Sequence, residues 1–322
     1  MKHLFILNPA AGKYNHSVEF TKKIAAVCKP RGLDYETSIS AYKGNCTELA
    51  RAAAETGEPV HIYACGGDGT LNEVINGASG FPNAAVTHFP GGSGNDFIRI
   101  FSDHAAFSDL ERLLDYEETA FDLIDVNGQS LCLNICSMGV DARITADIPR
   151  IKRLPLISGS GAYNLSTACN LVKGMHRPCE VEMDGQSFSG EMTLVAICNG
   201  RYYGGGFQPM PDAEPDDGLL DVLLISKAGL LAAAKVIGDF KAGLYALHPE
   251  YCTHYRTKEL TIRCKQVSPI NVDGEILQGQ EVHFSVSPKK VRFFYPRGLT
   301  YHLQNDESGS KTEESSDFSV SH

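Results

Sequence analysis

Residues 66–73 constrain the fold of this chain more than any other stretch. They read Gly-Gly-Asp-Gly-Thr-Leu-Asn-Glu, follow an apolar run at 60–65 and begin a helix-like run at 71–78. A buried strand that ends in glycines and leads into a helix brings backbone N–H groups against a phosphate. The carboxylate of Asp68 would repel that phosphate unless a cation lay between them. The loop therefore predicts an α/β fold, and with it nucleotide binding, a metal ion and phosphoryl transfer.

The first 121 residues alternate between strand-like and helix-like runs. The strand-like runs are short and apolar, and the helix-like runs repeat apolar residues at helical spacing. Such alternation implies right-handed βαβ crossovers and a mostly parallel, doubly wound sheet. The strand-like runs are 3–8, 35–40, 60–64 and 85–89, and the helix-like runs are 18–28, 46–55 and 71–78.

The pattern changes near residue 121, from where the chain reads mostly as short strands joined by hairpin turns. Two helical segments, 161–173 and 230–247, interrupt the strands. The pattern predicts a β-rich, sandwich-like second domain over residues 122–290. Residues 305–322 are rich in Ser, Glu and Asp and poor in apolar side chains, which predicts a disordered tail. The strand-like runs are 121–126, 131–137, 180–183, 191–199, 219–225, 259–264, 282–286 and 291–295.

Charge and cysteine content argue against several classes of protein. The formal net charge of the 322-residue chain is −10 at pH 7, which argues against a broad nucleic-acid-binding surface. Its 10 cysteines are scattered singly without zinc-ligand spacing, so we expect free thiols in a reducing cytoplasm. We recognise no signal peptide in the opening residues, and no apolar stretch approaches the roughly 20 residues that span a bilayer.

Two further loops follow strand-like runs in the first domain. Residues 8–12 read Asn-Pro-Ala-Ala-Gly, and residues 90–96 read Pro-Gly-Gly-Ser-Gly-Asn-Asp. A plain turn explains the first loop, and a polar residue of the second could simply cap a helix. Loops that follow adjacent parallel strands nevertheless meet at one edge of the sheet, where α/β proteins bind ligands. Asp68 and Asp96 would then face one cleft, and two carboxylates beside phosphate predict Mg²⁺.

Five motifs in one order are more specific than any of them alone. The two motifs in the second domain, Asp-Asp-Gly-Leu-Leu-Asp and Val-Asp-Gly-Glu, read singly as solvated turns. Together the five resemble the diacylglycerol kinase catalytic family, specifically its soluble bacterial lipid kinases. Sphingosine and ceramide kinases share this catalytic core, and NAD kinases share the Gly-Gly-Asp-Gly loop more distantly. The motifs lie at residues 8–12, 66–72, 92–97, 216–221 and 272–275, and the resemblance covers residues 1–303.

The resemblance implies that the N-terminal α/β domain, residues 1–121, binds ATP and that the active site lies in the cleft between the two domains. The final strand, within residues 291–303, would return to the first domain. Asp273 matches the general base, which would accept the proton of the lipid hydroxyl as its oxygen attacks the γ-phosphorus. Glu275 would orient or polarise that base. General-base assistance contributes about 100- to 10,000-fold to the rate.

The resemblance also implies which residues hold the nucleotide and its metal. Asp68 and Asp96 would organise catalytic Mg²⁺, partly through water. A further hydroxyl would contact ATP before the second helix; Ser40 is our candidate and Thr37 the alternative. The predicted ATP contacts are Asn8, Pro9, Ala10, Ala11, Gly12, Ser40, Gly66, Gly67, Asp68, Gly69, Thr70, Leu71, Asn72 and Ser93.

The acidic segment at 212–218 resembles a structural Mg²⁺ site of the same family, in which one carboxylate and two backbone carbonyls hold the metal. By position, Asp217 would give its carboxylate, and Glu214 and Leu219 would give their carbonyls. Whether Asp216 or Asp217 is the ligand stays open.

The activity implied by the resemblance is ATP- and Mg²⁺-dependent transfer of a phosphoryl group to a lipid hydroxyl, most simply from ATP to diacylglycerol to give phosphatidic acid. The alternatives are a kinase for a sphingoid base or another alcohol, and a nucleotide-binding regulator on the same fold. NAD kinase fits less well, because the motifs at 92–97 and 216–221 match the lipid branch. Asp68, Asp96 and Asp273 are all present, which favours an enzyme over a regulator.

A lipid substrate requires transient contact with a membrane surface. Residues 148–157 interleave three cations, Arg150, Lys152 and Arg153, with apolar side chains, and anionic lipid attracts such a segment. An ordinary basic loop that covers a core is the alternative interpretation. A homodimer through an edge strand of the β-rich domain is compatible with the sequence but not specified by it.

Overall fold

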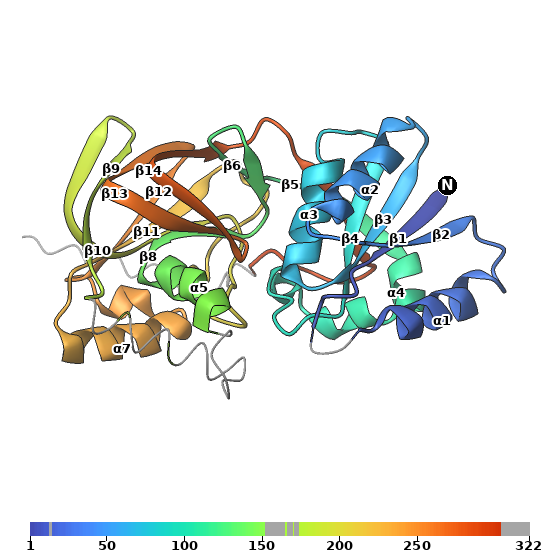
Figure 1. The fold of residues 1–322 in the computed structure, drawn as a ribbon, viewed down its shortest axis with the longest axis horizontal. Helices are drawn as coiled ribbons and strands as arrows, with labels where there is room; N and C mark the ends of the chain where they lie inside the picture. The colour runs from blue at the N-terminus through green and yellow to red at the C-terminus, as the bar shows by residue number, and fades with distance from the viewer. Residues whose placement is uncertain (13–14, 152–164, 166–169, 171–173, 304–322) are drawn as a thin grey trace, which may run out of the picture.

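The computed structural model describes residues 1–12, 15–151, 165, 170 and 174–303, whose strands form two sheets side by side (Figure 1). The first sheet has six strands in the order β2-β1-β3-β4-β15-β5. Its neighbouring strands are parallel except for β15 and β5, which are antiparallel. The strands are β1 (Lys2–Leu7), β2 (Tyr35–Ile39), β3 (Val60–Gly66), β4 (Ala84–Pro90), β5 (Tyr116–Phe121) and β15 (Val291–Pro296).

Helices cover both faces of the first sheet, which confirms the predicted doubly wound α/β domain (Figure 1). On one face α2 and α3 pack together, and on the other α1 contacts α4. Gly77 allows the contact of α3 with α2, because a Cβ there would lie 2.3 Å from the carbonyl oxygen of Thr47. The helices are α1 (Ser17–Cys28), α2 (Asn45–Glu55), α3 (Asp68–Ala78) and α4 (Leu110–Leu114), with 3-10 turns η1 (Phe97–Ile100) and η2 (His104–Ser108).

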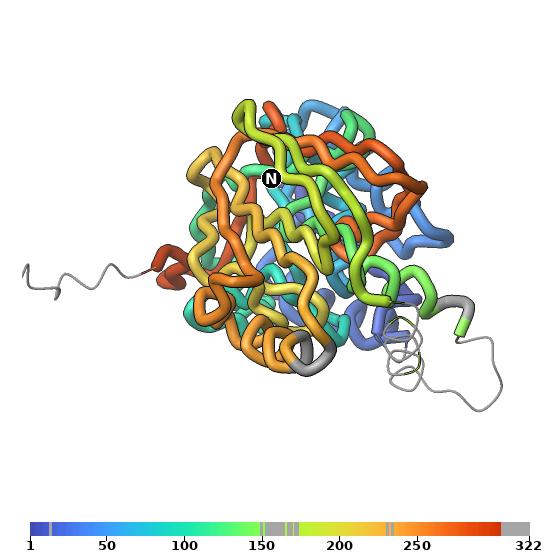
Figure 2. Tube along the Cα trace, turned by 90° about the vertical axis from the view of Figure 1, so that its left-hand side faces the viewer, coloured from blue at the N-terminus to red at the C-terminus, as the bar shows by residue number. Residues whose placement is uncertain are grey.

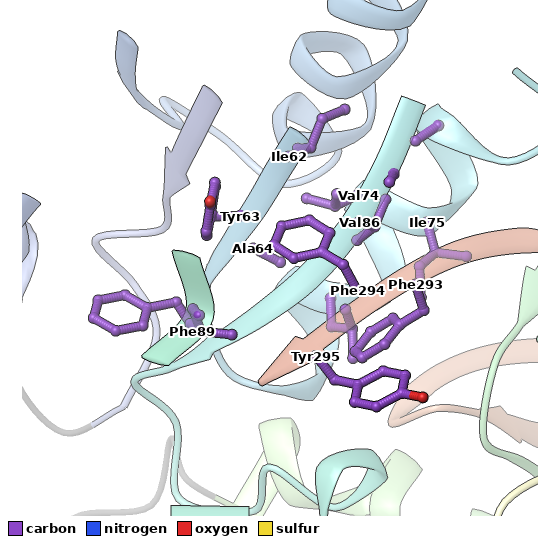
Figure 3. Packing of buried hydrophobic residues seen from close by; sticks show 14 of the residues in the cluster. Ile62, Tyr63, Ala64, Val74, Ile75, Val86, Phe89, Phe293, Phe294 and Tyr295 are labelled. Atoms are coloured by element: carbon purple, nitrogen blue, oxygen red, sulfur yellow. The ribbon is translucent and has the colours of Figure 1, made fainter. Parts of the chain in front are cut away.

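The last strand, β15, lies inside the first sheet between β4 and β5. Its Phe293 and Phe294 are fully buried, and Figure 3 shows them among side chains of β3, β4 and α3. The ring of Phe294 stacks on that of His61 with centroids 4.4 Å apart. Burying a phenylalanine stabilises a fold by about 1.5–3 kcal/mol, so this strand contributes to the core of the first half. The predicted domain limits, 1–121 with 291–303 and 122–290, stay a prediction.

The second sheet has nine strands and bends around an apolar interior. The strand order is β12-β11-β10-β8-β13-β14-β6-β7, and β9 pairs with both β10 and β13. Each of these two long strands carries a register shift, which lets it curve. The arrangement confirms the predicted β-rich, sandwich-like domain. The strands are β6 (Ile124–Val126), β7 (Ser130–Cys132), β8 (Ile135–Gly139), β9 (Arg177–Met183), β10 (Gln186–Cys198), β11 (Leu220–Ser226), β12 (Cys252–Thr257), β13 (Glu259–Val272) and β14 (Glu275–Val286).

Two helices, α5 (Val140–Ile151) and α7 (Leu230–Lys241), accompany the second sheet, and Figures 1 and 2 show α7 below it. The sequence pattern does not predict α5, because Pro149 and the cations near it interrupt the helical spacing. The helix predicted at 230–247 ends earlier, since Gly243 adopts a φ of 78°. The chain then continues as a short 3-10 turn, η3 (Tyr245–Leu247).

Some predictions fall outside the described residues. These are most of the helix at 161–173, the tail at 305–322 and most of the basic segment at 148–157, whose beginning forms the end of α5. Within the part of the chain that the structure describes, we find no helix both long enough and apolar enough to cross a bilayer.

Candidate active site

Three loops meet at the carboxyl edge of the first sheet, after β1, β3 and β4. Their backbones touch, and the N–H of Gly91 donates to the carbonyl of Gly66 over 2.7 Å. A Cβ on Gly92 would lie 2.5 Å from the Cα of Gly67, and one on Gly12 would lie 2.6 Å from the carbonyl oxygen of Gly91. Glycine is required here because a side chain would push the loops apart. The contact forms the edge at which the sequence predicts phosphate binding.

A pocket of about 340 Å³ lies beside these loops. Its lining includes Ser40 and not Thr37. The amide of Asn8 donates to Thr70 Oγ1 over 2.9 Å, which ties the loop after β1 to the start of α3. The predicted ATP contacts that line the pocket are Asn8, Pro9, Ala10, Ala11, Ser40, Gly67, Gly69 and Thr70.

The other predicted ATP contacts do not line this pocket. Gly12 and Gly66 pack within the loops, and Leu71 is buried in the core of the first half. The side chain of Asn72 bonds to the second half, and Ser93 is exposed on the loop after β4. Their contact with ATP stays a prediction.

The sequence analysis missed residues 41–43 and Glu73, which also line the pocket. Lys43 is the one cation among its described lining residues, and its ammonium pairs with the carboxylate of Glu275 from the second half. The carboxylate of Glu73 accepts the N–H of Gly44 over 2.9 Å, which holds the start of α2 beside the pocket. No phosphate-binding motif marks this loop, so only its place in the fold reveals it.

Asp68 and Asp96 lie together near the loop contacts. Asp68 accepts two backbone N–H groups, that of Asp96 on Oδ1 over 2.6 Å and that of Asn95 on Oδ2 over 2.8 Å. A Cβ on Gly94 would lie 2.5 Å from Asp68 Oδ2 and 3.3 Å from Asp96 Oδ2, so both carboxylates are open to one point. Asp96 Oδ1 is buried without a hydrogen-bond partner among the described residues, with Arg99 Nε 3.2 Å away. This oxygen set fits Mg²⁺, which binds one or two carboxylates and keeps waters.

The second half reaches this carboxylate pair through a glycine loop. The N–H of Gly205 donates to Asp96 Oδ2 over 2.7 Å. Gly204, Gly205 and Gly206 all have positive φ, between 60° and 105°, a conformation that favours glycine. Burial raises the pKa of Asp96, and the contact with Gly205 offsets part of that shift. A cation bound here would favour the ionised carboxylate.

Asp273 occupies the turn between β13 and β14, with a φ of 46°. Its Oδ2 accepts the N–H groups of Leu133 over 2.9 Å and Asn134 over 3.2 Å. The same oxygen accepts the amide of Asn72 over 3.1 Å, whereas Oδ1 accepts the N–H of Ile135 over 2.9 Å. The thiol of Cys132 also bonds to this carboxylate. Oδ2 accepts three of these backbone and amide donors and Oδ1 accepts one, which makes Oδ1 the candidate acceptor for a substrate hydroxyl.

Burial raises the pKa of Asp273, and its hydrogen bonds with Ile135, Cys132, Asn134 and Asn72 offset part of the shift. A raised pKa brings a carboxylate closer to the range in which a general base is effective. The bond from Asn72 joins α3 to the base, and the pair of Lys43 with Glu275 makes a second link across the cleft. That Glu275 orients Asp273 stays a prediction.

At the predicted structural metal site, Asp217 already bonds to other protein groups. Asp217 pairs with Arg256 through Oδ2 and accepts the N–H of Leu219 on Oδ1 over 2.9 Å. The carboxylate of Glu214 accepts from Arg201 over 2.9 Å. Arg256 thus balances the charge of Asp217 that a metal would balance. The alternative ligand, Asp216, lies with Glu214 and His302 in a group that could hold a metal ion. Metal binding by Glu214, Asp217 and Leu219 stays a prediction.

The second half also contains an apolar cavity of about 170 Å³ between α5, α7 and the strands β10 and β11. Ile144, Leu194, Phe207 and Phe240 are among its apolar lining residues. The loop that carries Gly204 lines the cavity on one side and bonds to Asp96 through Gly205. The cavity therefore adjoins the carboxylate pair.

Comparison with known proteins shows that this chain is similar to lipid kinases. Residues 2–126 match the family described as "Diacylglycerol kinase catalytic domain", and residues 134–295 match "YegS C-terminal NAD kinase beta sandwich-like domain". A "Probable lipid kinase YegS-like" of Pseudomonas aeruginosa is 30% identical, over 89% of this chain and 93% of that protein. A "Diacylglycerol kinase" of Bacillus subtilis is 30% identical, over 84% of this chain and 88% of that protein.

A solved structure of a diacylglycerol kinase from Bacillus anthracis has a similar fold. It superimposes with a TM-score of 0.66 at 21% identity, covering 93% of this chain and 98% of that one. At this identity the likeness shows the fold alone.

Proposed function

Because this chain belongs to the family of lipid kinases built on the diacylglycerol kinase catalytic domain, and is thus a phosphotransferase with an alcohol as acceptor, we propose that it transfers the γ-phosphoryl group of ATP to a lipid hydroxyl with the help of Mg²⁺. The observation that carries the proposal is the meeting, at one cleft, of a glycine-lined pocket, an open carboxylate pair and Asp273. Diacylglycerol is the reference acceptor.

The pocket would hold ATP through backbone N–H groups. Residues 66–70 end a strand and begin α3, so the positive end of the helix faces the phosphates. Asp68 and Asp96 would hold Mg²⁺, which supplies charge stabilisation to the transferring phosphoryl group when bound. Lys43 would add a positive charge on the opposite side of the pocket.

Asp273 would accept the proton of the lipid hydroxyl at Oδ1, which has fewer backbone and amide donors than Oδ2. Asn72 and the N–H groups of residues 133–135 hold its other bonds, so the carboxylate is oriented before substrate arrives. The apolar cavity would receive an acyl chain. A substrate that resides in a bilayer implies transient membrane contact, for which the cationic segment at 148–157 is our candidate.

The test is transfer from labelled ATP to lipids in mixed micelles, with diacylglycerol, monoacylglycerol, a long-chain amino alcohol and glycerol as acceptors. We expect labelled lipid that depends on Mg²⁺ and is lost when EDTA is added. Transfer to glycerol alone would instead favour a kinase for a soluble alcohol. Nucleotide binding without transfer to any acceptor would favour a regulator and overturn the proposal.

Replacing Lys43 with glutamine should raise the KM for ATP about 10-fold and change kcat little, because a charge-assisted bond to phosphate is lost while the reacting groups stay in place. Initial rates at varied ATP measure this. Lys2→Gln is the matched control, since Lys2 also pairs with a glutamate, Glu36, but is not among the pocket-lining residues. Equal KM values for the Lys43 variant and the control would contradict a role in binding ATP.

A further inference from the structure

One carboxylate interrupts the apolar cavity of the second half. Asp141, in the first turn of α5, lines the cavity beside Val140 and Ile144. A charged side chain at an apolar surface costs free energy unless other groups stabilise it or a ligand uses it. The bonds of Asp141 therefore indicate what the cavity can bind.

The groups that bond to Asp141 are all neutral donors. Oδ2 accepts the hydroxyl of Ser137 over 2.5 Å and that of Tyr203 over 3.2 Å, and Oδ1 accepts the N–H of Ala142 over 2.7 Å. A carboxylate that accepts three hydrogen bonds is best suited to the ionised form, which only accepts. The N-terminal end of α5 also stabilises a negative charge. Among the described residues Asp141 has no ion-pair partner, since the guanidinium of Arg143 donates to backbone carbonyls. Burial raises the pKa of Asp141, and its hydrogen bonds with Ser137, Ala142 and Tyr203 offset part of that shift. A ligand that donates a further hydrogen bond would favour the ionised carboxylate.

On both β8 and β13, the residue associated with Asp141 is two positions from the residue associated with Asp273. Ile135, whose N–H bonds to Asp273, is two residues before Ser137 on β8. On β13, Asn271 pairs with Ser137, lines the cavity and is two residues before Asp273. Residues two apart on a strand share a face and are about 7 Å apart. An acceptor with its reacting hydroxyl at Asp273 thus brings its next polar group towards Asp141.

We propose that Asp141 determines acceptor specificity by binding a hydrogen-bond donor, a hydroxyl or an ammonium group, next to the hydroxyl that is phosphorylated. The inference rests on the proposed function and refines it. Diacylglycerol presents only ester oxygens at this place, and two acceptors repel each other. A monoacylglycerol or a long-chain amino alcohol presents a donor to the carboxylate. The protein therefore prefers these lipids to diacylglycerol.

The kinetic test compares the wild type with Asp141→Asn on three acceptors: a monoacylglycerol, a long-chain amino alcohol and diacylglycerol. We expect kcat/KM of the variant to fall about 10- to 100-fold for at least one donor-bearing lipid, the range for loss of a charged hydrogen bond, and to hold or rise for diacylglycerol. A loss for the amino alcohol alone identifies an ammonium site, and a loss for both identifies a site for donors in general. Thr145→Val is the matched control, since Thr145 lines the same cavity without a charge.

A binding measurement separates this inference from the proposed function. Calorimetric titration with a long-chain amine and with the methyl ester of equal chain length requires no phosphoryl transfer. The wild type should bind the amine at least about 10-fold more tightly than the ester, and Asp141→Asn should lose that difference. Should the asparagine variant not fold, Asp141→Leu takes its place. Equal affinities of the wild type for the amine and the ester would overturn the role of Asp141. An equal fall in kcat/KM for every acceptor in the variant would also overturn it. If no lipid accepts phosphate but the difference in binding is intact, only the kinase proposal is overturned.

Discussion

The variant Asp273→Asn is expected to lose phosphoryl transfer by about 100- to 10,000-fold in kcat, with the KM for ATP little changed. An amide nitrogen cannot take the proton of the lipid hydroxyl. In the wild type the acidic limb of the pH–rate profile should lie above the usual carboxylate range, because burial raises the pKa of Asp273. The base works only when ionised, so kcat falls as the pH drops through that raised pKa. Initial rates at saturating ATP and lipid, measured across pH, test both statements.

Loss of fold must be distinguished from loss of the base. Both oxygens of Asp273 accept backbone N–H groups, and an asparagine would turn its own N–H₂ against some of them. Asp184→Asn is the matched control, because Asp184 also has positive φ, 50°, and precedes a glycine in a hairpin turn. Thermal unfolding of both variants should be recorded alongside the rates. A folded Asp273 variant with activity like that of the control would contradict the assignment of the base.

Asp68→Asn should lower kcat by about 100- to 1000-fold and raise the Mg²⁺ concentration that gives half-maximal rate. The substitution removes a charge from the carboxylate pair and one of two oxygens that accept the N–H groups of Asn95 and Asp96. Initial rates at varied Mg²⁺ concentration measure both kcat and the Mg²⁺ concentration that gives half-maximal rate. The effect on Mg²⁺ follows from the shared opening at Gly94, where both carboxylates approach one point.

Asp109→Asn serves as the control for Asp68. Asp109 also accepts a backbone N–H, that of Glu111 over 2.9 Å, but caps α4 at the surface. The two variants therefore share the loss of one acceptor and differ in their distance from the site. If the Asp68 variant keeps the Mg²⁺ dependence of the wild type, the metal is held elsewhere and the assignment of the carboxylate pair fails.

The sequence predicts the loops of this protein well because their conformation is local. Gly12 and Gly92 are needed where backbones touch, and at Gly66 and Gly91 a Cβ would collide with the side chains of Thr70 and Phe20. Alternation of apolar runs likewise predicts both sheets, since a strand buried on both faces is apolar throughout and a hairpin needs turn residues. The strand and turn patterns require no knowledge of which distant segments meet.

The site depends on contacts that the sequence does not display. Asn72 and Asp273 are 201 positions apart, and a side-chain bond between them has no local signature. No sequence motif marks Lys43, and only the fold shows that it pairs with Glu275. In the sequence, Asp141 resembles any acidic residue near the start of a helix. The helix α5 itself is not predicted, because Pro149 interrupts its helical pattern. Site residues could thus be predicted where their role depends on loop conformation. They could not be predicted where their role depends on how one half packs against the other.

The position of β15 has a consequence for the order in which the protein can be made. Residues of this strand fill the gap between β4 and β5, although they are synthesised some 170 residues after β5 ends, at Phe121. While the ribosome is still translating the β-rich half, β4 presents an unpaired edge. Nascent chains with such edges are prone to mispairing, and a chaperone or rapid folding of the intervening half would protect them. The first half therefore completes its sheet only after the β-rich half has been synthesised, although most of it is encoded first.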